Sequence, residues 1–298
     1  MPSLSKSVLF CIPFLFAAST AFANNYEQCI VIVDRSPDRA FEIAAEWRDY
    51  GGGAPAEHCM ALALIGQGKA ERAAELLDEM ARTIKDDPAS EGRTPEQIRL
   101  QRADLLTQAG NAWLLAEAPD KAYMRFTDAL AEQGLPLDWR VETLTDRARA
   151  AADLNDQDSA VDDLTDALEL GGPRPDVLTY RAAAQRALGA VVKAREDVDA
   201  ALALNPDYYE ALFERGHLNH QVGNDDAAIV DWLQVTYIAP DTPAALAAEA
   251  NIKSVREARA ASGQEGAMPP TPAAPPNPAL PADAHSEVDQ PDPAAPAP

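Results

Sequence analysis

Glu214, His217 and His220 are the residues whose types and spacing come nearest to a reactive site. Their E-x-x-H-x-x-H spacing puts a carboxylate and two imidazoles on one face of a predicted helix, close enough to approach one metal ion. The segment lacks an H-E-x-x-H motif, and no other histidine lies near it among the predicted helices. Paired surface histidines are common in proteins, so we expect neither a metal nor any other cofactor.

The sequence carries no other signature of an enzyme. It has no G-x-S-x-G motif and no nucleotide fingerprint, and Gly51 to Gly53 are not followed by the G-K-[ST] of a phosphate loop. Its carboxylates are too numerous and too regularly spaced to single out a catalytic pair. We therefore predict that the protein is not an enzyme. The alternative is an envelope or cell-wall enzyme, or a regulatory subunit of one, that uses the acidic surface or a metal at His217.

The first 23 residues have the pattern of a secretory signal peptide. Lys6 precedes an apolar stretch from Val8 to Ala18, and the sequence Ala-Phe-Ala ends at Ala23. Cleavage after Ala23 predicts a periplasmic protein. No later segment has the ~20 apolar residues that a membrane span needs, so we expect no membrane insertion.

Two cysteines, Cys29 and Cys59, follow the predicted cleavage point, in a compartment where thiols oxidise. We expect them to form one structural disulfide, and the alternative is a pair of free thiols buried among helices. The absence of a C-x-x-C motif from the sequence argues against a redox enzyme.

Three residue types recur at one fixed interval. Arginine, aspartate and alanine share the same spacing: Arg147, Arg181 and Arg215; Asp163, Asp197 and Asp231; Ala160, Ala194 and Ala228. The sequence between these positions is compatible with helix throughout, and a period of about 34 residues is the length of a repeated unit of two antiparallel helices. Such a unit buries its shared face only by stacking on the next unit.

Further positions agree with the same repeat, with small residues where two helices must touch and larger ones where a hairpin must be filled. They are Leu106, Ala109, Gly110, Trp113, Ala122, Phe126 and Ala129; Leu144, Ala148, Leu164 and Ala167; Leu178, Ala182, Gly189, Val198, Ala201 and Pro206; Leu212, Gly216, Gly223, Trp232, Val235 and Pro240. On these residues the chain resembles the tetratricopeptide repeat (TPR) proteins, of an exported bacterial type. Two departures are Gly134 and Gly172 in place of the turn proline, and a four-residue insertion at Leu135 to Asp138.

The resemblance implies an all-α fold, a right-handed α-solenoid of TPR-type helical hairpins with a C-terminal capping helix and a disordered tail. The expected order is a signal peptide at 1–23, two degenerate helical hairpins at 24–85, four TPR-like repeats at 94–240, a capping helix at 241–262 and a disordered acidic tail at 263–298. The last thirty residues hold eleven of the 24 prolines and no Lys, Arg or aromatic residue, so they have too little apolar surface to form a core.

The resemblance also implies roles for single residues. It places each Arg of the repeating series opposite the Asp sixteen positions later, which predicts three ion pairs within hairpins: Arg147 with Asp163, Arg181 with Asp197, and Arg215 with Asp231. An arginine ladder that binds an acidic peptide is the alternative. The first helix of each pair lines a concave groove in this family. The expected groove residues are Asn111, Leu115, Arg149, Asp153, Thr179, Arg186, Phe213, His217 and His220.

The net charge of the chain limits the classes of partner that it can bind. It has 48 acidic and 25 basic residues and a formal net charge of −23, spread along the sequence, which argues against nucleic acid and favours partners with basic patches. We therefore expect a periplasmic adaptor or scaffold that binds a segment of another envelope protein in the groove of a TPR superhelix. Its partner is a protein or peptide.

Overall fold

A computed structural model describes residues 26–84 and 92–262, and this part of the chain is all-α. Residues 26–33 form a first helix. The further helical elements are α2 Pro37–Trp47, η1 Arg48–Gly52, α3 Gly53–Gly66, α4 Ala70–Thr83, α5 Pro95–Leu115, α6 Pro119–Ala131, α7 Leu137–Asp153, α8 Gln157–Gly171, α9 Pro175–Ala187, α10 Val191–Leu204, α11 Tyr209–Gln221, α12 Asp225–Ile238 and α13 Pro243–Ala261. The predicted signal peptide at 1–23 and the predicted tail at 263–298 lie outside the described residues.

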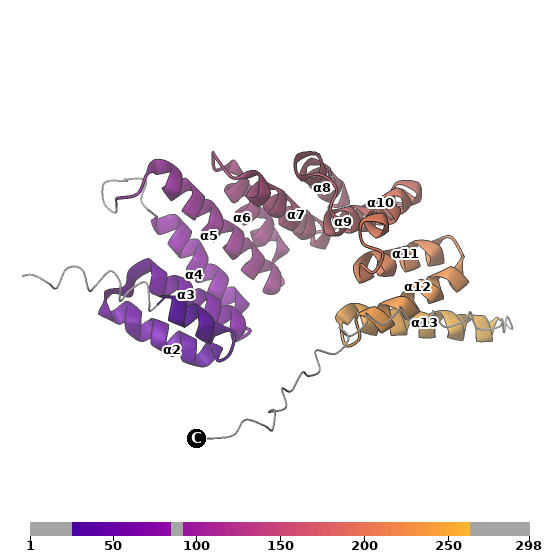
Figure 1. Ribbon diagram of the computed structural model, residues 1–298, viewed down its shortest axis with the longest axis horizontal. Coiled ribbons are helices and arrows are strands. Elements are labelled where there is room, and N and C mark those ends of the chain that lie inside the picture. Colours follow the sequence, from indigo (N-terminus) through magenta and orange to yellow (C-terminus); the bar gives the residue numbers. More distant parts are fainter. Residues whose placement is uncertain (1–25, 85–91, 263–298) are drawn as a thin grey trace, which may run out of the picture.

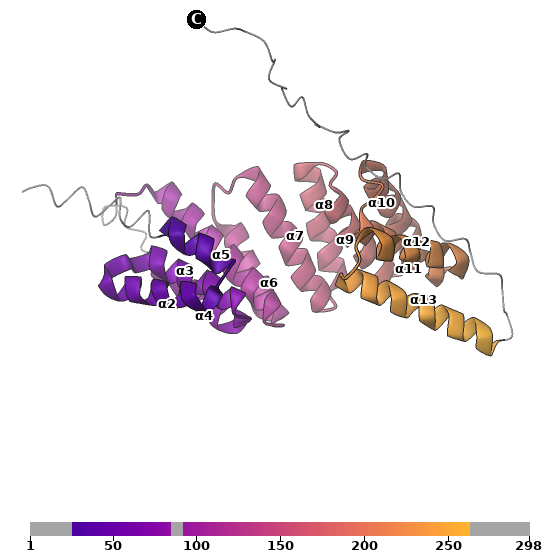
Figure 2. The same ribbon diagram turned by 60° about the horizontal axis from the view of Figure 1, so that its bottom comes forward.

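The helices stack in sequence order into an arch, with α2 near one end and α13 at the other (Figures 1 and 2). Helices α3 to α12 pair as successive hairpins, and each hairpin packs on the next. Each of these hairpins has a first helix (α3, α5, α7, α9, α11) and a second helix (α4, α6, α8, α10, α12). The chain is therefore an α-solenoid of the TPR type.

The two sides of the solenoid pack differently. Helix α5 packs against α7, α7 against α9 and α9 against α11, so the first helices of neighbouring hairpins lie close together. Among the described residues, the second helices do not pack on one another in this way, although the Arg125 side chain of α6 reaches Asp78 of α4 at 3.0 Å. A row of hairpins that approach more closely along one side must bend toward that side. The first helices therefore form the inner side of the bend.

Each hairpin is closed by a small residue on its first helix and a large one sixteen positions later on its second. Gly110 faces Phe126, and a methyl group added at Gly110 would lie 2.5 Å from Cε1 of that ring. Gly216 faces Trp232 in the same way. In the two hairpins between them the corresponding pairs are Ala148 with Leu164 and Ala182 with Val198, all buried. Glycine thus accompanies the aromatic residues, and alanine accompanies the aliphatic ones.

The turn inside each hairpin uses one left-handed residue at the same place. The equivalent positions are Gly68, Glu117, Asn155, Gly189 and Gly223, with φ between 56° and 79°. Glycine takes this conformation without strain, and asparagine tolerates it better than most residues. The backbone of the turn is therefore constant while its sequence changes.

The four-residue insertion is absorbed by a helix. Helix α7 has 17 residues, whereas α9 has 13, and α7 begins at Leu137 within the inserted segment. The added length amounts to about one helical turn. Equivalent residues of α7 and α9 therefore lie on the same side of their helices. The interval from α5 to α7 is longer than that from α7 to α9 by the length of the inserted segment.

The N-terminal helices are joined by a covalent bond. The structure has a disulfide between Cys29, on the helix of residues 26–33, and Cys59 on α3, with Cα atoms 6.3 Å apart. Both side chains are fully buried beside Ala40, Ala44 and Ala63. At the other end, α13 covers the last hairpin with Ala248, Ile252 and Val255. The disulfide thus fixes the N-terminal helices to each other, and α13 covers the last hairpin at the other end.

Candidate protein-binding face

Three buried ion pairs lie inside the hairpins. The guanidinium of Arg147 contacts the Asp163 carboxylate at 2.6 Å, and Arg181 with Asp197 and Arg215 with Asp231 repeat the arrangement at 2.7 Å. Each Asp is at most 6% exposed. The hydrogen bond to Asp197 raises the pKa of Arg181 further above its usual value. These arginines fasten the two helices of a hairpin and are not free to receive an acidic peptide.

Two of these arginines also reach the preceding hairpin. Arg147 donates to the Thr127 hydroxyl of α6 at 3.4 Å, and Arg181 donates to the Thr165 hydroxyl of α8 at 3.3 Å. One side chain therefore ties together three helices.

A second set of contacts joins the first helices of neighbouring hairpins. His58 Nε2 on α3 lies 2.7 Å from Gln108 Oε1 on α5, and Asn111 on α5 donates to Asp146 on α7 at 3.0 Å. The Arg149 guanidinium on α7 lies 5.8 Å from the centre of the Tyr180 ring on α9. Arg186 on α9 donates to Glu214 on α11 at 2.5 Å. We call these contacts the bridging row.

The second partners of the bridging contacts, three hydrogen-bond acceptors and the Tyr180 ring, occupy one repeated position. Gln108, Asp146, Tyr180 and Glu214 follow one another at the same intervals as the hairpins themselves. The sequence pointed only to Glu214, and as a metal ligand, because the residue types at this position differ from repeat to repeat. The regular interval, corrected for the four-residue insertion, is the signal that would have found them.

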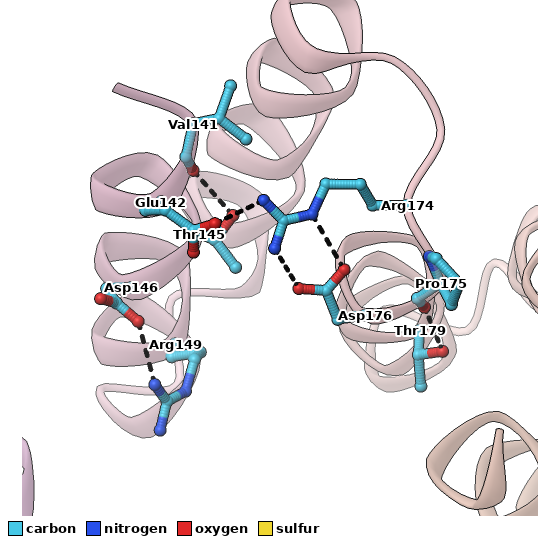
Figure 3. Close-up of polar contacts among 9 residues, drawn as sticks. All are labelled: Val141, Glu142, Thr145, Asp146, Arg149, Arg174, Pro175, Asp176 and Thr179. Atoms are coloured by element: carbon cyan, nitrogen blue, oxygen red, sulfur yellow. Dashed lines mark hydrogen bonds and ion pairs between the residues drawn. The ribbon is translucent and has the colours of Figure 1, made fainter. Parts of the chain in front are cut away.

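Arg174 forms a further bridge between α7 and α9 (Figure 3). Its guanidinium lies between two carboxylates and donates to Glu142 on α7 at 2.6 Å and to Asp176 on α9 at 2.5 Å. Nearby, Arg149 donates to Asp146 at 3.0 Å. Glu142 and Asp176 are equivalent positions, one repeat apart. This place on the solenoid therefore binds a guanidinium between successive first helices.

The residues expected to line the groove fall into three groups. Leu115, Arg149, Asp153 and His220 are exposed, while Asn111, Arg186, Phe213 and His217 are half-buried. Thr179 is only 6% exposed, and its hydroxyl donates to the Pro175 carbonyl at 2.7 Å. The expectation that Thr179 contacts a partner is therefore wrong, since α9 and α11 pack closely here and the hydroxyl is satisfied within its own helix.

Arg186, which was expected to point into an open groove, is instead engaged in an ion pair. It pairs with Glu214, whose side chain is buried, and burial raises the pKa of that carboxyl despite the opposing effect of Arg186. Removal of the arginine would leave a buried carboxylate without its cation. Arg186 therefore stabilises the contact between α9 and α11 in addition to any contact with a partner.

His217 and His220 each have their own neighbours. The His217 ring packs edge-on against Phe213 and Trp232, with ring centres 4.5 and 5.6 Å apart, and burial lowers its pKa to about 4. His220 Nδ1 lies 2.7 Å from Asp225. Among the described residues no three His, Cys, Asp or Glu side chains are grouped as a metal site would require. At neutral pH, His217 is an uncharged part of an aromatic cluster.

We define the inner face as the partly or fully exposed side chains of the first helices along the bridging row. Its residues are Asp104, Asn111, Glu142, Arg149, Asp153, Asp176, Tyr180, Arg186, Glu210, Phe213 and His217. Carboxylates outnumber guanidinium groups in this set, and two of the carboxylates already share Arg174. The inner face is therefore acidic, with aromatic rings toward α9 and α11.

Comparisons with known proteins identify the fold. No protein-family model and no curated protein matches the sequence. Among solved structures, the chain is similar to PilF of Pseudomonas aeruginosa, with 17% identity over 78% of this chain and 99% of that one and a TM-score of 0.54. It is also similar to the C-terminal part of a TPR repeat-containing protein of Cytophaga hutchinsonii, with 12% identity over 81% of this chain and 100% of that one and a TM-score of 0.54. The chain has the TPR fold.

Proposed function

We propose that this TPR solenoid is an exported adaptor that holds an extended or helical segment of an envelope protein against its inner face. One observation carries the proposal. The first helices of successive hairpins present exposed aromatic and charged side chains to a common side, and the bridging row holds those helices at fixed separations. A surface arranged in this way binds a chain segment that runs across several repeats.

The chemistry of the inner face favours a basic segment. Carboxylates predominate there, and acidic surfaces attract and orient partners of opposite charge. Tyr180, which is 40% exposed, and the half-buried Phe213 supply apolar area beside these charges. Aromatic residues of this kind contribute most to binding energy when a partner covers them.

Export is supported by the pattern of residues 1–23 and by the buried disulfide, because disulfides persist in oxidising compartments. No helix within the described ranges has the length and apolar character to cross a bilayer. Fractionation of cells that express the full chain tests this part of the proposal. We expect the processed protein in the periplasmic fraction, and its recovery in the cytoplasm with an intact N-terminus would contradict export.

Site-specific photocrosslinking in intact cells tests the binding face. A photoreactive phenylalanine analogue replaces Tyr180 on the first helix α9 in one strain and Tyr237 on the second helix α12 in another. The two tyrosines form a matched pair, since they are 40% and 54% exposed. We expect Tyr180 to capture a defined envelope protein that mass spectrometry identifies, and Tyr237 to capture little.

Capture of the same protein from Tyr237 but not from Tyr180 would place the binding face on the second helices and overturn the proposal. Capture of no envelope protein from Tyr180 would also count against an adaptor. An activity screen of the purified protein on cell-wall fragments, with and without zinc, tests the alternative of an enzyme. We expect no turnover in either condition.

A further inference from the structure

A cavity of about 400 Å³ opens between α3 and α5 near the N-terminal end of the solenoid. Its walls come from the helix of residues 26–33 and from α3, α4 and α5. Apolar groups of Pro55, Met80 and Leu105 form much of the lining, together with the rings of Tyr26 and His58. Asp104 supplies a carboxylate.

The ring groups of the cavity satisfy one another. His58 Nε2 lies 2.7 Å from the Gln108 amide oxygen, which can only accept, so this nitrogen carries the proton. His58 Nδ1 then accepts from the Tyr26 hydroxyl at 2.8 Å. Both ring nitrogens of His58 are therefore hydrogen-bonded within the protein.

Asp104 differs from the other polar groups in the cavity. It is exposed, and within the described residues no cation or hydrogen-bond donor contacts its carboxylate. The carboxylate and the Tyr26 phenol line the same cavity, and burial together with the charge of Asp104 raises the pKa of that phenol. An apolar cavity with one unpaired carboxylate matches a cation with an apolar stem.

The solenoid itself shows which cation fits such a position. Asp104, Glu142 and Asp176 are equivalent residues of three successive hairpins. Glu142 and Asp176 hold the guanidinium of Arg174 between them. Arg102 and Arg140 take the positions equivalent to Arg174, but within the described residues neither contacts Asp104, and Arg102 instead pairs with Glu132 and the Ile84 carbonyl. The repeat thus has the same carboxylate at Asp104, and among the described residues no guanidinium is paired with it.

We infer that this cavity binds an arginine side chain of the segment held on the inner face. The arginine stem lies along Met80 and Leu105, and its guanidinium pairs with Asp104 beside the Tyr26 ring. Arginine fits better than lysine because its planar group makes two-point contact with a carboxylate and stacks on aromatic rings. This inference rests on the proposed adaptor function and adds the chemistry by which a segment is recognised.

NMR of the whole exported chain with labelled methionine methyl groups tests the inference without a known partner. Met80 reports on the cavity, and Met124 on α6 serves as an internal control because it is 51% exposed and lies outside the cavity. The probes are end-blocked tripeptides Gly-Arg-Gly, Gly-Lys-Gly and Gly-citrulline-Gly. We expect the arginine tripeptide to shift the Met80 signal and leave that of Met124 unchanged, with weaker binding of the lysine form and none of citrulline.

Asp104→Asn keeps the shape of the side chain and removes its charge. We expect this variant to melt like the wild type and to bind the arginine tripeptide about tenfold more weakly or worse. Asp138→Asn, which changes an exposed carboxylate in the first turn of α7, is the matched control and should bind normally. Equal binding of citrulline, or full binding by Asp104→Asn, would overturn the inference. Equal affinity for the lysine tripeptide would overturn the assignment to arginine.

The outcomes separate this inference from the adaptor proposal. If Tyr180 captures an envelope protein while the arginine tripeptide leaves Met80 unchanged, the cavity inference fails and the adaptor proposal stands. If the tripeptide binds in a way that depends on Asp104 but Tyr180 captures nothing, the cavity site stands by itself and its proposed role in an adaptor fails.

Discussion

The hairpins α5–α6 and α7–α8 have the same architecture and different interiors. The first closes with Gly110 against Phe126, and the second with Ala148 against Leu164. The first has Ala109 and Arg125 where the second has the ion pair of Arg147 and Asp163. In both hairpins the combined volume of the two facing side chains and the contact between the two helices are maintained, while the individual residues change.

The N-terminal helices extend this contrast. They have no counterpart of the Arg–Asp pair, since Met60 and Leu76 take the equivalent positions in α3 and α4. The disulfide from Cys29 to Cys59 fastens the first helix there instead. One solenoid therefore uses a covalent bond at one end and buried ion pairs toward the other.

The largest effect is expected from removal of the disulfide. Replacing Cys29 and Cys59 by alanine should destabilise the N-terminal helices by about 3 to 4 kcal/mol, because the bond closes a loop of about 30 residues in the chain-entropy model. Hydrogen exchange should show faster opening of residues 26–66 and little change in α9–α12. Two free thiols in mass analysis of the exported protein would show that the bond does not form.

Gly110→Ala tests the volume rule. The added methyl group collides with Phe126, so we expect a loss of about 2 to 3 kcal/mol, although alanine favours the helix by about 1 kcal/mol. Adding Phe126→Leu should recover much of this loss, because the pair then resembles Ala148 with Leu164. Thermal melts of the two single variants and the double variant measure the coupling. If the stability losses of the two single variants simply add in the double variant, the volume rule is refuted.

Arg181→Ala tests the buried ion pair. It leaves the Asp197 carboxylate buried between helices without its cation, which should cost about 1 to 3 kcal/mol by denaturant unfolding. The double variant with Asp197→Ala should be less destabilised than the single one. Arg149→Ala is the control, since Arg149 is exposed and its loss should be nearly neutral. An equal loss of stability in Arg181→Ala and Arg149→Ala would mean that burial does not distinguish the two arginines.

The smallest effect concerns His217 in the aromatic cluster of α11–α12. Burial, Arg186 and His220 lower its pKa to about 4 from the ordinary 6.5, so the unfolded chain binds a proton in this range that the folded protein does not. Its contribution to stability is therefore complete above pH 6.5 and is lost as the pH falls toward 4. After allowance for the partly exposed ring, the effect is on the order of 1 kcal/mol.

His217→Gln should reduce the dependence of the melting temperature on pH between 4 and 6.5. An NMR titration of the ring protons checks the same point directly. A midpoint near 6.5 would contradict the buried environment.

The sequence predicts the fold better than the inner face, and particular residues show why. The fixed interval of the arginine series and the sixteen-position separation of Arg181 from Asp197 depend only on helix geometry, which is local and regular. Thr179 was misplaced because position in a helix does not reveal how tightly the neighbouring first helix packs. The bridging contacts were not predicted because their first partners, His58, Asn111, Arg149 and Arg186, include three residue types, and Arg186 lies three positions beyond the repeat of Asn111 and Arg149.

The bridging row also gives the solenoid a mechanical direction. Its polar contacts span neighbouring first helices at several hairpins, whereas the described second helices have one such contact, between Arg125 of α6 and Asp78 of α4 at 3.0 Å. Straightening the arch stretches these contacts, whereas tightening it compresses them. The molecule therefore resists one sense of bending more stiffly than the other, and a segment that displaced Asp146 or Glu214 from its bridge would soften the curvature beside its own binding position.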